Sequence, residues 1–158
     1  MQKTTRENVA IIAIISIAAF TGNMLNIGLS YAVYWESLDP TSFMKDFAVK
    51  FPLLLAPTAI ALLPALIATT LSFILHRDRL VARRSWMIAL LGLLLTVGIT
   101  LIYHLPTNLA FIELRYPPAE ATYRLQVWIF LHWVRTIVTL LAAVFAIFGF
   151  RELIKSVN

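Results

Sequence analysis

Five side chains in the second half of the chain have the chemistry of a binding or catalytic site. They lie beside or inside strongly apolar segments: His104, Asn108, Trp128, His132 and Arg135. Polar groups are costly in hydrocarbon and are usually kept there for a function. An imidazole can accept a proton, and a guanidinium or an amide can hold a carbonyl oxygen or an oxyanion. His132 could therefore be a general base, a metal or haem ligand, or a hydrogen-bonding core residue, and we take His132 and Arg135 as the candidate catalytic residues.

The spacing of these residues places them on one side of their helices. In the last apolar segment the polar and aromatic residues recur every three or four positions, which is one face of a helix: Arg124, Trp128, His132, Arg135 and Thr139. Asn23 and Asn26 form a similar stripe in the first segment, and Thr100 and His104 in the third. In a helical bundle such stripes should face inward, towards each other.

The composition assigns the chain to the membrane class. Of its 158 residues, 60% are hydrophobic and only 13% are charged, whereas a soluble domain has roughly 25% charged residues. The net charge of +5 would suggest nucleic acid for a soluble protein, but here the basic residues stand between apolar runs. We read them as topology signals, and nucleic acid is not an expected partner. The absence of cysteine excludes disulfides and thiolate metal sites.

Four apolar segments are long enough to cross a bilayer, at about 9–35, 52–75, 85–104 and 123–150. Between the first two, Phe43, Phe47 and Phe51 recur every four residues after the N-cap candidate Asp39. This pattern predicts a short amphipathic helix over about 41–50. We expect an all-α, integral membrane four-helix bundle, with 1–158 as a single membrane domain. Pro106 should end the third helix.

Depth counts place the polar residues at one level. His104 lies 20 residues after Arg84, which is roughly 30 Å of helix, and His132 lies roughly 28 Å before Arg151. Both distances approach the thickness of the hydrocarbon core, about 30 Å. The sequence thus predicts a small polar pocket that opens outward, is capped by the 41–50 helix, and is lined by Asn23, Asn26, His104, Asn108 and Trp128.

The basic residues predict the orientation. The turn over 76–84 carries four arginines, and the two ends of the chain are also basic, so the positive-inside rule places that turn and both termini in the cytoplasm. A bacterial inner (plasma) membrane is the expected location. The basic start could instead begin a signal peptide, but the apolar run is roughly twice as long as a signal core of about 7–15 residues. A bundle of this size could also form a homodimer, although no GxxxG stripe demands it.

Several chemistries find no support in the sequence. It has no phosphate loop, nucleophile elbow or HExxH motif, and no acid within a span. We predict no cofactor and no metal site. Haem or a metal held by His104 and His132 is the less favoured alternative. Each of these residues also has a structural reading, because interfacial His and Trp are common anchors and Asn often joins helices.

At these residues the chain resembles the anthrone-oxygenase-like family of small four-helix membrane proteins. The resemblance rests on short motifs that together span most of the chain: Gly22, Pro52 or Pro57, the segment from Phe43 to Phe47, Pro106-Thr107-Asn108, and Trp128, His132 and Arg135. Characterised members oxidise anthrones to anthraquinones with O₂. The resemblance implies an oxygenase or oxidoreductase in which His132 removes a proton, Arg135 and Asn108 stabilise the oxyanion, and Trp128 stacks on a flat substrate.

Two functions remain open from the sequence. The first is a membrane-embedded, cofactor-independent oxygenase for a lipophilic, anthrone- or quinone-like molecule that partitions into the bilayer. The second is a non-enzymatic membrane protein that binds a lipid, quinone or haem, or that serves as a subunit of an envelope complex. Fold-level analogy alone does not decide between them.

Overall fold

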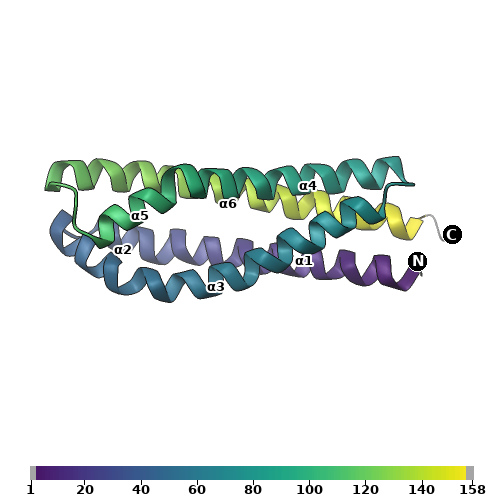
Figure 1. Ribbon diagram of the computed structural model, residues 1–158, viewed down its shortest axis with the longest axis horizontal. Coiled ribbons are helices and arrows are strands. Elements are labelled where there is room, and N and C mark those ends of the chain that lie inside the picture. The colour runs from purple at the N-terminus through teal and green to yellow at the C-terminus, as the bar shows by residue number, and fades with distance from the viewer. Residues whose placement is uncertain (1–2, 156–158) are drawn as a thin grey trace.

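The computed structural model describes residues 3–155, which form an elongated bundle of four long helical rods (Figure 1). The rods are apolar and long enough to cross a membrane. Within the described range there is no strand. The elements in chain order are α1 (Lys3–Asn26), the π-helical turn η1 (Ile27–Ala32), α2 (Val33–Glu36), α3 (Pro40–Leu75), α4 (Leu80–Ile99), the π-helical turn η2 (Thr100–His104), α5 (Leu105–Ile112) and α6 (Pro118–Lys155).

The four-span prediction is confirmed, but all four rods are longer than the segments predicted from the sequence. The first rod runs continuously through α1, η1 and α2, and the third through α4, η2 and α5. The predicted amphipathic helix is not a separate element, because it forms the first turns of α3. Asp39 caps that helix as expected, accepting hydrogen bonds from the backbone N–H groups of Thr41 (3.2 Å) and Ser42 (3.1 Å).

The prediction that Pro106 ends the third helix is wrong. The rod continues through α5 to Ile112. The turn η2 lies directly before the proline, and in it the N–H of Leu105 bonds to the carbonyl of Thr100, five residues earlier. A π-helical turn is wider than an α-helical one, so the ring is accommodated at the start of α5 where an ordinary turn would clash with it.

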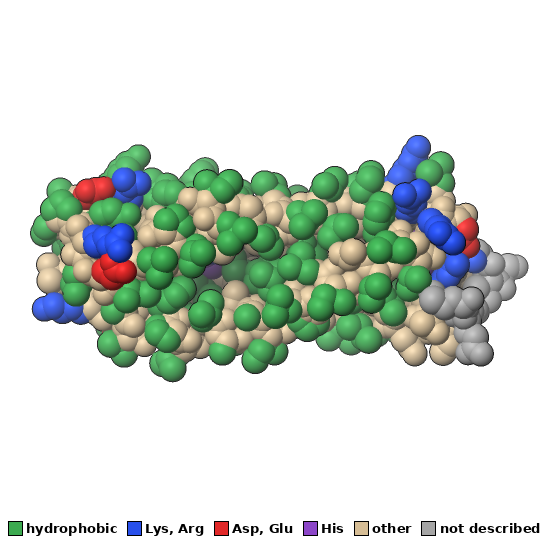
Figure 2. All heavy atoms as spheres, in the orientation of Figure 1, with side chains coloured by type: hydrophobic (Ala, Val, Ile, Leu, Met, Phe, Trp, Pro, Cys, Tyr) green, Lys and Arg blue, Asp and Glu red, His purple; other side chains and the backbone are tan. Residues whose placement is uncertain are grey.

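The two ends of the bundle are packed differently. The end that carries both termini, here called the terminal end, has a core of small residues around Trp86, which lets the helix backbones approach closely. The opposite end, here called the aromatic end, has a core of rings from α2, α3, α5 and α6. On the face shown in Figure 2, charged side chains gather at the two ends and leave the middle apolar, as expected for a protein that spans a bilayer.

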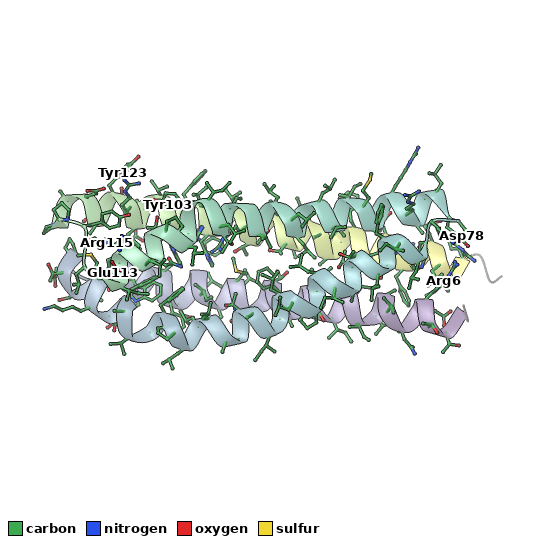
Figure 3. All side chains as sticks on the ribbon, in the orientation of Figure 1. Arg6, Asp78, Tyr103, Glu113, Arg115 and Tyr123 are labelled. Atoms are coloured by element: carbon green, nitrogen blue, oxygen red, sulfur yellow. The ribbon has the colours of Figure 1, made fainter. Side chains whose placement is uncertain are left out.

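Ion pairs and a buried histidine fix the terminal end. Arg6 of α1 binds Asp78 in the turn after α3 at 2.9 Å (Figure 3), and this hydrogen bond lowers the pKa of Asp78. His76 lies in the basic turn, where a solvated side chain is expected, but it is 0% exposed, with its Nδ1–H donating to the carbonyl of Ser72. Burial lowers the pKa of His76, so the neutral imidazole is favoured there.

Candidate functional site

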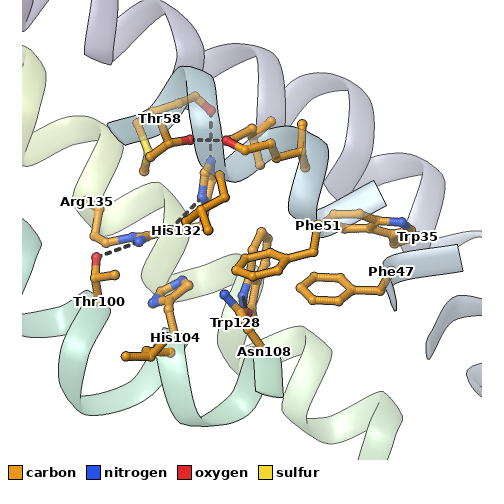
Figure 4. Close-up of a pocket in the computed structure, with 15 residues that line it drawn as sticks. Trp35, Phe47, Phe51, Thr58, Thr100, His104, Asn108, Trp128, His132 and Arg135 are labelled. Carbon is orange, nitrogen blue, oxygen red and sulfur yellow. Dashed lines mark hydrogen bonds between the residues drawn. The ribbon is translucent and has the colours of Figure 1, made fainter. Parts of the chain in front are cut away.

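One cavity lies inside the bundle, between the aromatic core and the small-residue core. Its volume is about 110 Å³, compared with roughly 10–15 Å³ for a single water molecule. Most of its wall is apolar, with a few polar side chains that come from α3, η2, α5 and α6 (Figure 4). The polar and aromatic residues predicted from the second half of the chain all line it: His104, Asn108, Trp128, His132 and Arg135.

Arg135 is a buried cation without a counterion. Its side chain lies in the wall of the cavity, and the residue is only 7% exposed. One Nη atom donates to Thr100 Oγ1 at 2.7 Å and the other to His132 Nδ1 at 3.0 Å, while Nε makes no hydrogen bond. No aspartate or glutamate among residues 3–155 lines the cavity. Because both its partners are neutral, the guanidinium can also donate hydrogen bonds to a negatively charged or strongly polar oxygen of a ligand.

His132 is held by hydrogen bonds at both ring nitrogens. Its Nε2–H donates to the backbone carbonyl of Met24 at 2.8 Å, and its Nδ1 accepts from Arg135. These partners define a neutral ring protonated at Nε2. Since its only free lone pair is already occupied by the guanidinium, His132 is poorly suited to remove a proton from a ligand. It is well placed to orient Arg135.

His104 differs from His132 in the hydrogen bonding of its ring. The residue is 1% exposed, and neither ring nitrogen makes a hydrogen bond of good geometry, although the backbone carbonyls of Ile99 and Trp128 lie near the ring. Its ring packs against Trp128, with centroids 5.2 Å apart. A buried imidazole without a hydrogen bond is costly. The ring is therefore available to bond with a molecule in the cavity.

Trp128 and Asn108 form a fixed pair. The indole N–H donates to Asn108 Oδ1 at 2.8 Å, which leaves the amide NH₂ of Asn108 free to donate. The indole ring also stacks on His132, with centroids 5.2 Å apart and planes 6° from parallel. Trp128 is thus held between two polar residues of the site and is not a free stacking platform.

The first rod contributes to the site differently from the prediction. Asn23 donates to Thr58 Oγ1 of α3 at 2.8 Å, and Asn26 is exposed, so neither residue lines the cavity. The contribution of this rod is the carbonyl of Met24, which precedes η1. Gly28 permits the close approach, because a Cβ there would stand 3.1 Å from Trp133 and 3.3 Å from His132.

The predicted outward opening is closed. Trp35, Phe43, Phe47 and Phe111 fill the aromatic end and are 0–1% exposed. Trp35 is fixed by a hydrogen bond from its Nε1 to Asp46 at 2.8 Å. The phenylalanine periodicity identified this face of α3, but not the contribution of Trp35. Thr100 was assigned to the polar stripe, and its bond to Arg135 could not be foreseen from spacing.

The side chains around the cavity do not form a binding site for a metal ion. No group of three or more His, Asp or Glu side chains that could hold a metal occurs among the described residues. His132 has neither nitrogen free for coordination, and the neighbouring guanidinium would repel a metal cation. His104 alone would be a single ligand, fewer than a protein metal-ion site has.

Fold and site together define a class: a polytopic helical membrane protein with a small buried cavity that combines an uncompensated cation with an unpaired histidine. The chain belongs to the anthrone oxygenase family, whose model matches residues 41–145, more than half of the chain. The matched range excludes the whole first rod and includes the polar side chains of α3, η2, α5 and α6 that line the cavity. No curated protein and no solved structure matches the chain.

Proposed function

We propose that the protein binds a flat, lipophilic anthrone-type ketone in the cavity and promotes its oxidation by O₂. The observation that carries this proposal is the pairing, in one small apolar cavity, of the buried Arg135 without a carboxylate partner and His104 without a hydrogen bond. Family membership supports the oxygenase class. The apolar wall suits a ligand that partitions into membranes.

In the proposed reaction His104 accepts a proton from the activated C–H group opposite the ketone. Arg135 and the free amide of Asn108 stabilise the negative charge that develops on the ketone oxygen. The electron-rich carbon then gives electrons to O₂ and forms a C–O bond. Loss of water from the resulting hydroperoxide yields the quinone. One anthrone and one O₂ therefore give one anthraquinone and one water, with O₂ reduced and the carbon oxidised.

His132 is reassigned from base to positioning residue in this proposal. Its hydrogen bond to Met24 fixes the ring, and its Nδ1 then holds the guanidinium of Arg135. The second candidate, a binding protein without turnover, is supported by the same donors, which would also hold a quinone oxygen.

For location, we propose a bacterial inner membrane with both termini in the cytoplasm. A homodimer stays a prediction from the sequence.

The test uses the histidines of the chain, of which there are three. Membranes containing wild-type protein are incubated with 1,8-dihydroxyanthrone, and quinone formation is followed by absorbance above the rate in membranes without the protein. His104→Gln should slow oxidation by about 100-fold or more, as for loss of a general base. His76→Gln is the matched control, since His76 lies at the terminal end, and its rate per folded protein should be unchanged.

Two outcomes would contradict the proposal. If wild-type membranes oxidise the anthrone no faster than membranes without the protein, the oxygenase function is wrong. If the His104→Gln variant retains the wild-type rate, oxidation does not depend on His104 as a base. Binding of the quinone product without turnover would favour the second candidate.

A further inference from the structure

The cavity is closed at both ends but not along the side of the bundle. The ring cluster closes the aromatic end, and the alanine-rich core closes the terminal end. Between α3 and the rod formed by α4, η2 and α5, the surface is hollowed, and a histidine side chain is visible at the floor of the hollow (Figure 2). The histidines that line the cavity are His104 and His132. The hollow is therefore the side opening of the cavity.

Leucines form the rim of this opening. Leu55 of α3 and Leu105 of α5 both line the cavity, yet they are 54% and 42% exposed, so each side chain lies at the boundary between cavity and surroundings. The surface beside them is also apolar and exposed, with Leu53 and Ile60 on α3 and Ile102 on η2. A rim of this kind faces acyl chains and not water.

Local helix geometry explains why α3 and the rod formed by α4, η2 and α5 separate at the level of the side opening. At the aromatic end α3 packs against α5 through Phe43 and Phe111, with ring centroids 4.8 Å apart. At the terminal end it joins the core around Trp86. Between these contacts α3 contains Pro52 and Pro57, and the facing rod contains the wide turn η2. Prolines and π-helical turns both interrupt regular helix geometry and packing.

The position of the opening along the helices agrees with the apolar residues that form its rim. Leu55 lies five residues beyond Lys50, which is roughly 7–8 Å along the helix, and Leu105 lies eight residues before Glu113, roughly 12 Å. Lys50 binds Asp46, and Glu113 binds Arg115 at the exposed end of the bundle. The rim thus lies below the level of the charged groups, inside the hydrocarbon layer.

We infer that the gap between Leu55 and Leu105 is a lateral portal through which a lipophilic aromatic ligand enters the cavity from the acyl-chain region of the bilayer. The ligand enters with its oxygen-bearing end first, because Arg135 and His104 lie on the inner side of this rim. The identity of the ligand rests on the proposed function, but the route does not require turnover. The portal also explains how a cavity closed towards water can be reached.

The absence of native cysteine allows a direct test. The double variant Leu55→Cys/Leu105→Cys is reconstituted in lipid nanodiscs and bridged with a reducible bis-methanethiosulfonate reagent. Binding of 1,8-dihydroxyanthraquinone is followed by stopped-flow quenching of tryptophan fluorescence. Bridging should slow association by at least about tenfold, as for a closed lid, and reduction should restore it.

The control is a second pair of cysteines, placed across another apolar groove. Leu95→Cys/Leu141→Cys spans the exposed groove between α4 and α6, and bridging it should leave the association rate unchanged. An equal rate for the open and bridged forms of the 55/105 pair would overturn the portal and leave the proposed binding intact. No binding in the open form would overturn both. Bridge-sensitive binding without oxidation of the anthrone would support the portal and overturn the proposed catalysis.

Discussion

At the scale of single residues, the site is built around an electrostatic cost. A guanidinium buried in a membrane protein without a carboxylate is destabilising by several kcal/mol, even after local relaxation. The hydrogen bonds of Arg135 to the neutral groups of Thr100 and His132 involve a charged donor and recover roughly 1.5–3 kcal/mol each. When an anionic oxygen enters the cavity, its attraction to the guanidinium offsets the remaining cost and so favours binding. Preorganised donors act on developing charge in this way.

This cost predicts opposite effects of Arg135→Leu on stability and function. The variant should unfold at the same or a higher temperature, with a gain of roughly 1–3 kcal/mol as for other buried charges replaced by apolar residues, while anthrone oxidation is lost. Thermal unfolding in detergent micelles measures the first effect. Arg124→Gln is the control, because Arg124 binds Glu120 at the surface. A large loss of stability in Arg135→Leu would mean that the guanidinium holds the bundle together.

At the scale of helices, the helix backbones approach closely at the terminal end, and regular helix geometry is interrupted at the level of the cavity. Close approach is required at the terminal end, where a Cβ on Gly149 of α6 would lie only 2.7 Å from Trp86 Nε1. Interruption occurs at the level of the cavity, where α3 has prolines and the first and third rods have π-helical turns. Such turns are frequent at functional sites. The rigid packing of the terminal end thus fixes the helices between which the cavity lies.

Gly149→Ala should therefore be destabilising by roughly 1–3 kcal/mol, because a buried indole must shift to accommodate the methyl group. Gly22→Ala is the matched control. A Cβ on Gly22 meets no heavy atom within 4 Å, so this change should be stabilising by roughly 0.5–1 kcal/mol through the helix preference of alanine. Thermal unfolding of the two variants compares them. A neutral Gly149→Ala would show that the helices can separate there without cost.

At the scale of the whole molecule, the charges define an axis. The terminal end carries both termini and the basic turn after α3 (Figure 1), and the opposite end has balanced pairs such as Arg115–Glu113. From the positive-inside rule we expect the terminal end to lie in the cytoplasm. In that orientation we expect the portal nearer the outer leaflet, on the side of the bundle.

Single cysteines test this orientation without changing the charge of the loops. Ala119→Cys, at the start of α6, should react with a membrane-impermeant maleimide in intact spheroplasts. Leu80→Cys, at the start of α4, should react only after the membrane is permeabilised. Both positions are exposed. The reverse labelling pattern would show that the terminal end faces outward. Equal labelling of both cysteines would indicate mixed orientation.

The sequence alone determined the membrane class, the four spans, the cap at Asp39 and the polar face of α6. These follow from local rules, because hydrocarbon requires each spanning backbone to satisfy its own hydrogen bonds in a helix. The stripe over Trp128, His132 and Arg135 could be predicted for the same reason, since these residues share one helix and its period is fixed. Family resemblance was also visible in short motifs and is confirmed by the family match.

Only the tertiary structure decided how the helices are rotated against one another. In α1 the buried stripe is apolar and includes Ile17, Phe20 and Met24, so Asn23 turns towards Thr58 of α3 and Asn26 towards the surface. Adjacent positions differ by about 100° around a helix, and contacts with other helices select among them. The same packing determined that His132 is fully bonded, that His104 is not, and that the cavity opens sideways between Leu55 and Leu105.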